Sequence, residues 1–83
     1  MTKIFLDVFT PGNGKTYEFQ LDDRLTVQAA KNRMAEEILR LEERGMNFGA
    51  QTLLCDLMTN TILPDNAALS GAGVRSGHRL LLV

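Results

Sequence analysis

Alternating apolar and polar positions open the chain and predict a β-hairpin. Residues 4–9 and 17–21 each place an apolar side chain at every second position, as a half-buried strand does. Between them, Pro11-Gly12-Asn13-Gly14 supplies the glycines that accept the positive backbone angles of a turn. Phe5 and Phe9 fall on the face opposite the apolar set Ile4, Leu6 and Val8.

From Thr26 the apolar spacing changes to three and four residues, which predicts an amphipathic helix. Thr26 is the expected N-cap and Gly45 the stop, so the helix should span about 18 residues. Its apolar stripe comprises Val27, Ala30, Met34, Ile38 and Leu41. The opposite face is expected to be solvated and carries Lys31, Arg33, Glu36, Glu37, Arg40, Glu42, Glu43 and Arg44.

The C-terminal half predicts a third strand at 52–58, a short strand at 62–63 and a last strand at 79–83. Burying the Asp56 carboxylate unpaired would be costly, so we expect Asp56 to face outward. That register sends Leu53, Cys55 and Leu57 inward and leaves Leu54 and Met58 outside. The last strand directs Leu80 and Leu82 inward and Arg79, Leu81 and Val83 outward.

The 83 residues form a single expected domain, 1–83, with 45% hydrophobic and 23% charged residues. A formal net charge of -1 supplies no basic field for a phosphate backbone, which argues against a nucleic-acid partner. Cys55 is the single cysteine, so it can form no internal disulfide, and its inward register predicts an inert core residue. A reducing compartment fits this composition best.

The N-terminus reaches an acidic residue, Asp7, too soon for the apolar core of a signal peptide. No run approaches the roughly 18 apolar residues of a membrane span. We therefore expect a cytoplasmic protein with no direct membrane insertion.

Three features suggest chemistry but fail on context, so we expect no enzyme, no cofactor and no metal. Gly12-Asn13-Gly14-Lys15-Thr16 ends like a phosphate-binding loop, but its first glycine is replaced by Phe9 and a strand follows instead of a helix. The glycines of 71–77 have too little chain after them for a dinucleotide-binding unit. His78 has no acidic or thiol partner at ligand spacing and reads as a surface histidine at a strand edge.

The order of predicted elements is hairpin, long helix, strand, short strand, turn and final strand. Together with Ile4-Phe5, Thr26-Val27, Pro64-Asp65 and Leu80-Leu81-Leu82-Val83, this order resembles ubiquitin. The resemblance implies an α+β, ubiquitin-like β-grasp fold: a mixed four- to five-stranded sheet with one long helix packed across it. In that fold the first and last strands are central neighbours, and the third strand pairs with the last.

Leu69-Ser70, Gly73-Val74, Gly77 and the closing alternating leucines are similar to the EsaB/YukD family of small bacterial proteins. These are cytoplasmic ubiquitin-like accessory proteins of type VII secretion in Gram-positive bacteria. The resemblance implies a non-enzymatic adaptor whose partner is a cytoplasmic part of a secretion apparatus. An acidic residue is usual in that family where this chain has His78.

Ubiquitin and sulfur carriers react through a flexible tail ending in two glycines, whereas this chain ends at Val83 within a predicted strand. The expectation is therefore the fold without conjugation chemistry. The alternative is a modifier or sulfur carrier that acts through its C-terminus, which a clipped precursor tail would allow.

The β-grasp order gathers a group of side chains on the sheet face away from the helix, and a large apolar patch there would predict protein binding. Self-association through a two-fold contact also remains open. Against this, the connector with Met46 and Phe48 could cover the face, or one strand could be out of register by one. The candidate docking residues are Phe5, Phe9, Leu54, Met58, Arg79, Leu81 and Val83.

Overall fold

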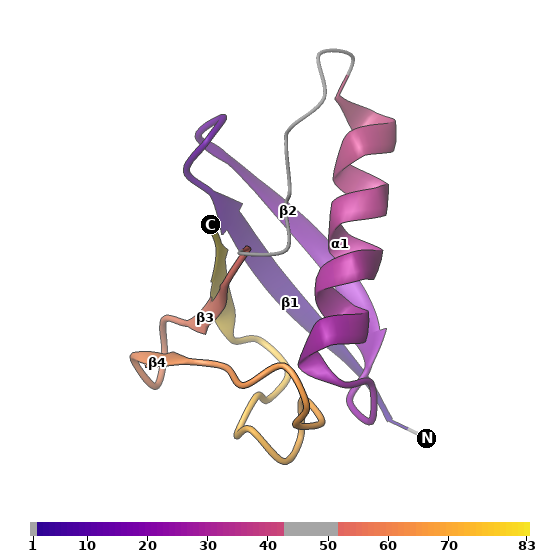
Figure 1. The fold of residues 1–83 in the computed structure, drawn as a ribbon, viewed down its shortest axis with the longest axis vertical. Coiled ribbons are helices and arrows are strands. Elements are labelled where there is room, and N and C mark those ends of the chain that lie inside the picture. Colours follow the sequence, from indigo (N-terminus) through magenta and orange to yellow (C-terminus); the bar gives the residue numbers. More distant parts are fainter. Residues whose placement is uncertain (1, 43–51) are drawn as a thin grey trace.

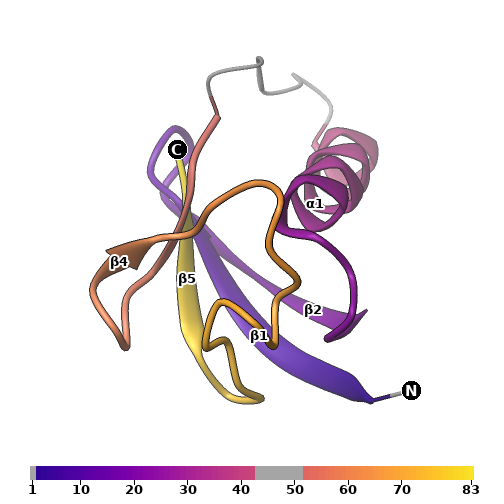
Figure 2. The same ribbon diagram turned by 60° about the horizontal axis from the view of Figure 1, so that its bottom comes forward.

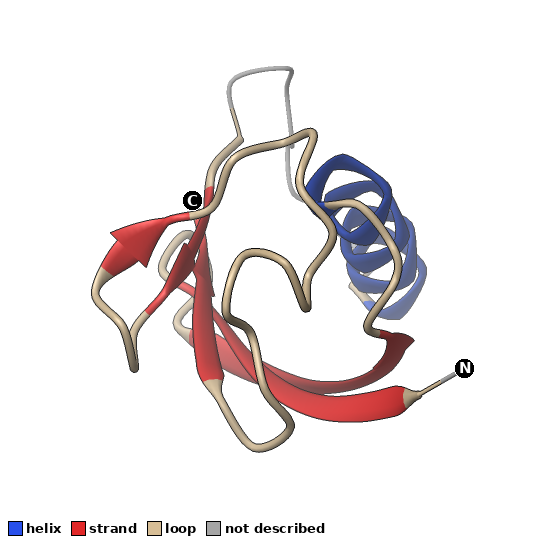
Figure 3. Cartoon of the chain, turned by 90° about the horizontal axis from the view of Figure 1, so that it is seen from below, coloured by secondary structure: helices blue, strands red, loops and turns tan. Residues whose placement is uncertain are grey.

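A computed structural model of the protein describes residues 2–42 and 52–83, in which one helix lies across one face of a five-stranded sheet (Figures 1 and 3). The sheet order is β2-β1-β5-β3-β4, with β1 and β5 parallel and every other pair antiparallel. This is the α+β architecture and the strand order predicted from the sequence. The elements are β1 (Lys3–Thr10), β2 (Lys15–Asp22), α1 (Val27–Leu41), β3 (Leu54–Asp56), β4 (Thr61–Ile62) and β5 (Arg79–Leu82).

The predicted hairpin is confirmed as β1 and β2, paired in register from Lys3 opposite Asp22 to Thr10 opposite Lys15. Gly14 closes the turn with a φ of 70°, which an L side chain rarely adopts. Phe5 and Phe9 are exposed, while Ile4, Leu6 and Val8 are buried against α1, as the alternation predicts.

Helix α1 begins where expected, because the Thr26 hydroxyl accepts a hydrogen bond from the Ala29 N–H at 3.1 Å. It ends at Leu41, earlier than predicted. The predicted stop Gly45 and the connector residues Met46 and Phe48 lie outside the described residues. Leu41 is exposed, so it does not belong to the buried stripe. The remaining four stripe residues are buried: Val27, Ala30, Met34 and Ile38.

Lys31 was expected on the solvated helix face but is only 6% exposed. Its ammonium lies 2.7 Å from the Thr52 carbonyl oxygen and 2.7 Å from Asp65 Oδ1. These two acceptors compensate for the loss of water around the charge, which is the condition for burying a lysine.

The predicted register of the third strand is wrong by one residue. Asp56 is fully buried and Leu54 is 1% exposed, whereas Cys55 between them faces the other side of the sheet. Asp56 avoids the expected penalty because Oδ1 accepts the Met58 N–H at 2.9 Å and Oδ2 lies 2.8 Å from Nδ1 of His78. His78 therefore does have an acidic partner, and it is not the free surface histidine that was expected.

The last strand follows its prediction. Leu80 and Leu82 are buried in β5, which lies between β1 and β3 at the centre of the sheet (Figure 2). Beyond the strand, Val83 and Leu53 exchange main-chain hydrogen bonds of 3.0 and 2.8 Å, so the pairing continues to the last residue. Within residues 2–42 and 52–83, no helix has the length and apolarity to cross a bilayer.

Candidate protein-docking face

The sheet face turned away from α1, here called the outer face, carries a row of side chains that crosses all five strands. Strand pairing places Phe9 opposite Thr16 on one side and beside Leu81 on the other. Leu81 is opposite Cys55, which is in turn opposite Ile62 on the edge strand β4. Four of the five positions are apolar, so the register itself aligns a continuous apolar row.

Further apolar side chains lie next to this row. Leu53 is paired with Val83 at one end of β5, and Leu57 donates its N–H to the Arg79 carbonyl at the other end at 2.9 Å. Seven large apolar residues of the outer face and the β3–β4 turn are at least 37% exposed: Phe5, Phe9, Leu53, Leu57, Met58, Ile62 and Val83. Such a concentration exceeds the scattered apolar exposure of an ordinary soluble surface.

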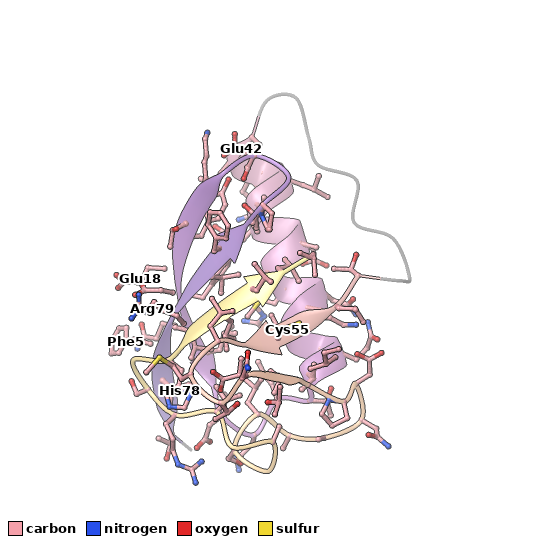
Figure 4. The ribbon with its side chains drawn as sticks, turned by 90° about the vertical axis from the view of Figure 1, so that its left-hand side faces the viewer. Phe5, Glu18, Glu42, Cys55, His78 and Arg79 are labelled. Atoms are coloured by element: carbon pink, nitrogen blue, oxygen red, sulfur yellow. The ribbon has the colours of Figure 1, made fainter. Side chains whose placement is uncertain are left out.

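A level of charged side chains runs next to the apolar row and crosses β2, β1 and β5. Asp7 of β1 is opposite Glu18 and beside Arg79, so two carboxylates and a guanidinium share one cross-strand level. Figure 4 shows Phe5, Glu18 and Arg79 on the same side of the sheet. Asp7 lies between Phe5 and Phe9 along β1, so the apolar row has charged groups along one of its sides.

Hydrogen bonds join the loop before β5 to strand β1. Phe5 donates its N–H to the Ser76 hydroxyl at 3.0 Å and accepts the Gly77 N–H at 2.7 Å. Gly77 has a φ of 88°, so a side chain at this position would strain the loop. The Asp56–His78 pair ties the same loop to β3, so the loop is bonded to both strands that flank β5.

A second polar cluster ties the hairpin turn to the end of α1 (Figure 4). Lys15 Nζ lies 3.0 Å from both carboxylate oxygens of Glu42, the Tyr17 hydroxyl donates to Glu42, and Asn13 donates to Tyr17 at 2.9 Å. The bonds from Tyr17 and Lys15 hold the pKa of Glu42 below its usual value, and the carboxylate in turn raises the pKa of Lys15. Burial, followed by the bond to Glu42, raises the pKa of Tyr17.

Among the residues that the structure describes, the outer face pairs no nucleophile with a base. His78 meets a carboxylate but no nucleophile, and the row places Cys55 among apolar neighbours without a base. Among residues 2–42 and 52–83 no group of three metal-ligating side chains comes together. What this face can do chemically is bury apolar area against another molecule.

The candidate residues taken from the sequence are mostly, but not all, on this face. Phe5, Phe9, Arg79, Leu81 and Val83 lie there, and Met58 is exposed in the turn that follows β3. Leu54 is buried in the core and drops out. The residues missed were Leu53, Cys55, Leu57 and Ile62. Leu53, Cys55 and Leu57 were missed because the predicted register of the third strand was wrong by one residue. Recognising His78 as a hydrogen-bond partner for a buried Asp56 would have given the correct register.

Searches for similarity gave matches to solved structures only. No family model matches the chain, and no curated protein matches it. The ubiquitin-like domain of Plasmodium falciparum Dsk2 is 22% identical, with a TM-score of 0.76 over 99% of this chain and 97% of that one. The ubiquitin-like domain of EccD5 from Mycobacterium xenopi is 20% identical, with a TM-score of 0.78 over 100% and 94%. The chain has the ubiquitin-like β-grasp fold.

A structure with much lower sequence identity to this chain has a similar fold. A chain of the toluene 4-monooxygenase HD complex is 7% identical, with a TM-score of 0.81 over 99% of this chain and 98% of that one. At such identities the likeness shows the fold alone, and function has to be argued from the outer face.

Proposed function

We propose that this chain is a non-enzymatic ubiquitin-like adaptor that docks its outer face on a protein partner. The observation that carries the proposal is the apolar row Phe9, Leu81, Cys55 and Ile62, aligned across four neighbouring strands by the sheet's own register. Ile62 is 64% exposed, so its burial on a partner would contribute up to about 1.5–3 kcal/mol.

The surface chemistry favours a protein over other macromolecules. The net charge of -1 and the carboxylates of Asp7 and Glu18 beside the row disfavour a phosphate backbone or an anionic bilayer. A protein with a complementary apolar patch and a basic residue near Glu18 fits both the row and the charged groups beside it. A β-sheet face is already ordered before binding, so docking carries a small conformational-entropy cost.

The pathway we propose is type VII secretion, with the adaptor acting in the cytoplasm. Leu69-Ser70, Gly73-Val74 and Gly77 resemble the EsaB/YukD accessory proteins, and Gly73 and Gly77 both adopt the positive φ that such turns need. One structural neighbour, the EccD5 ubiquitin-like domain, comes from a type VII secretion component. Both likenesses support this pathway as the setting for the outer face.

The test replaces the chromosomal gene in the source organism with an Ile62→Asp variant or with Leu41→Asp as the matched control. Leu41 is comparably exposed but lies at the end of α1, away from the outer face. Ile62→Asp should abolish export of the type VII secretion substrates at unchanged cellular levels of the variant, and Leu41→Asp should leave export intact. Normal export in the Ile62→Asp strain would overturn the proposal.

A further inference from the structure

Strand β2 forms one edge of the sheet, and one set of its main-chain groups points away from β1. The N–H groups of Phe5 and Asp7 point to the other side of β1, where they meet Ser76 and His78 at 3.0 and 3.2 Å. At the end of the hairpin Asp23 donates to Thr2 at 2.9 Å. Because antiparallel pairing alternates residue by residue, the outward-pointing groups of β2 belong to Thr16, Glu18, Gln20 and Asp22.

A groove runs beside this edge, between β2 and α1. Its volume is about 250 Å³, and it is lined by Arg33 and Glu37 of the helix and by residues 18–21 of the strand. The helix runs antiparallel to β2, since Glu42 at its end contacts Tyr17 while its start follows Asp22 by a short connector. Glu37 is therefore nearer to Glu18, where the groove-lining segment of β2 begins, and Arg33 is nearer to Leu21, where it ends.

We propose that β2 pairs with β2 of a second copy of this chain, around a two-fold axis that passes through Phe19. In that register Glu18 is opposite Gln20 and Thr16 is opposite Asp22 of the partner copy, so the N–H and C=O groups of Glu18 and Gln20 find counterparts. The Asp22 carbonyl already accepts the Leu25 N–H at 3.1 Å, so the strongest pairing is the central one between Glu18 and Gln20. Tyr17 then faces Leu21 across the axis on the helix side.

Charge selects this register over its neighbours. A shift that centres the axis on Glu18 sets two Glu18 carboxylates opposite each other, and one that centres it on Gln20 sets Glu18 opposite Asp22. An axis at Tyr17 places the C-terminal residues of each β2 opposite the hairpin turn of the partner copy, so fewer residues of the two strands pair. The register around Phe19 avoids all three costs.

Charged residues of α1 independently support a two-fold axis at Phe19. Because α1 is antiparallel to β2, rotation about the Phe19 axis brings Glu37 of one copy to Arg33 of the other, and Arg33 to Glu37. The lining of the groove is thus self-complementary in charge, which is what an interface between identical copies requires.

The dimer joins both five-stranded sheets into one continuous sheet. The axis is perpendicular to the sheet, so both helices lie on one side and both outer faces lie on the other. Two docking faces on one side would let the dimer engage two partner sites at once and gain affinity by multivalency. This last consequence rests on the proposed function, but the dimer itself does not.

Analytical ultracentrifugation of the purified protein, up to a concentration on the order of 1 mM, tests the proposal. The dimer should form, and Glu37→Arg should raise its dissociation constant roughly tenfold or more, because two contacts become repulsive at once. The double variant Arg33→Glu/Glu37→Arg has the charge of the wild type and should restore the dimer. Circular dichroism of each variant checks that it is folded.

Amide hydrogen exchange supplies the second measurement on the same samples. The N–H groups of Glu18 and Gln20 should become protected as concentration rises, while those already bonded within the chain should not change. A monomer throughout the range, or a dimer that the charge exchange does not restore, would overturn the proposal. Protection confined to β3, β4 and β5, without Glu18 and Gln20, would likewise overturn it and place self-association on the apolar row.

Discussion

The carboxylate of Asp56 and the imidazole of His78, 22 positions apart in the chain, meet inside the protein with Oδ2 and Nδ1 separated by 2.8 Å. Asp56 is fully buried, and its other oxygen accepts the Met58 N–H. With both oxygens engaged, Asp56 can face the core and Cys55 can face outward. One side-chain pair therefore fixes the register of β3 and the composition of the outer face.

Replacing His78 with alanine should lower the free energy of unfolding by about 1–3 kcal/mol, because it leaves a buried carboxylate oxygen without its partner. Urea unfolding followed by circular dichroism measures the change. Asp7→Asn, at an exposed carboxylate, is the matched control and should shift the value by less than about 0.5 kcal/mol. Equal stability of His78→Ala and the control would contradict the role given to the pair.

The outward position of Cys55 can be measured directly through its reactivity. The native protein should react with a small thiol reagent, since the side chain is half-buried on the outer face and not enclosed in the core. The reaction is followed by mass spectrometry under native conditions and compared with the urea-unfolded chain. Reaction only after unfolding would mean that the side chain is inward, as the sequence pattern alone predicts.

Lys31 should be the most costly charged residue of α1 to replace. Lys31→Met keeps the aliphatic stem but removes the bonds to Thr52 and Asp65, so it should lower the free energy of unfolding by about 1–3 kcal/mol. Arg40→Met, at an exposed position of the same helix, should change it by less than about 0.5 kcal/mol. Thermal or urea unfolding separates the two, and equal effects would contradict the account of the buried lysine.

The Glu42 cluster should make stability depend on acid pH. The folded pKa of Glu42 is lowered from its ordinary 4.5, so its bonds stabilise the fold above that pH and this contribution is lost as pH falls through the lowered value. For Lys15 the raised pKa gives the reverse: its contribution is present below 10.5 and is lost as pH rises beyond it.

The variant Glu42→Gln should therefore be less stable than the wild type near neutral pH, and the difference should shrink in acid. Urea unfolding of both proteins across the acid range provides the comparison. A difference that stays constant with pH would show that the charge of Glu42 is not what stabilises the fold.

Local patterns predicted most of this fold, and the exceptions share one cause. The hairpin, the start of α1 and the inward leucines of β5 follow from periodicity and capping, which neighbouring residues determine. Asp56 and Lys31 were misplaced because their burial depends on His78 and on Thr52 with Asp65, distant in sequence. The outer-face residues missed in β3 follow from that same long-range pair.

Site-specific photocrosslinking in the source organism tests the central claim, that the outer face docks on a protein, most directly. A photoreactive amino acid is placed at Ile62 on the apolar row, or at Leu41 on α1 as an equally exposed control. We predict a discrete crosslinked protein adduct from position 62 and none from position 41. Identical crosslinking from both positions, or none from position 62, would contradict the account.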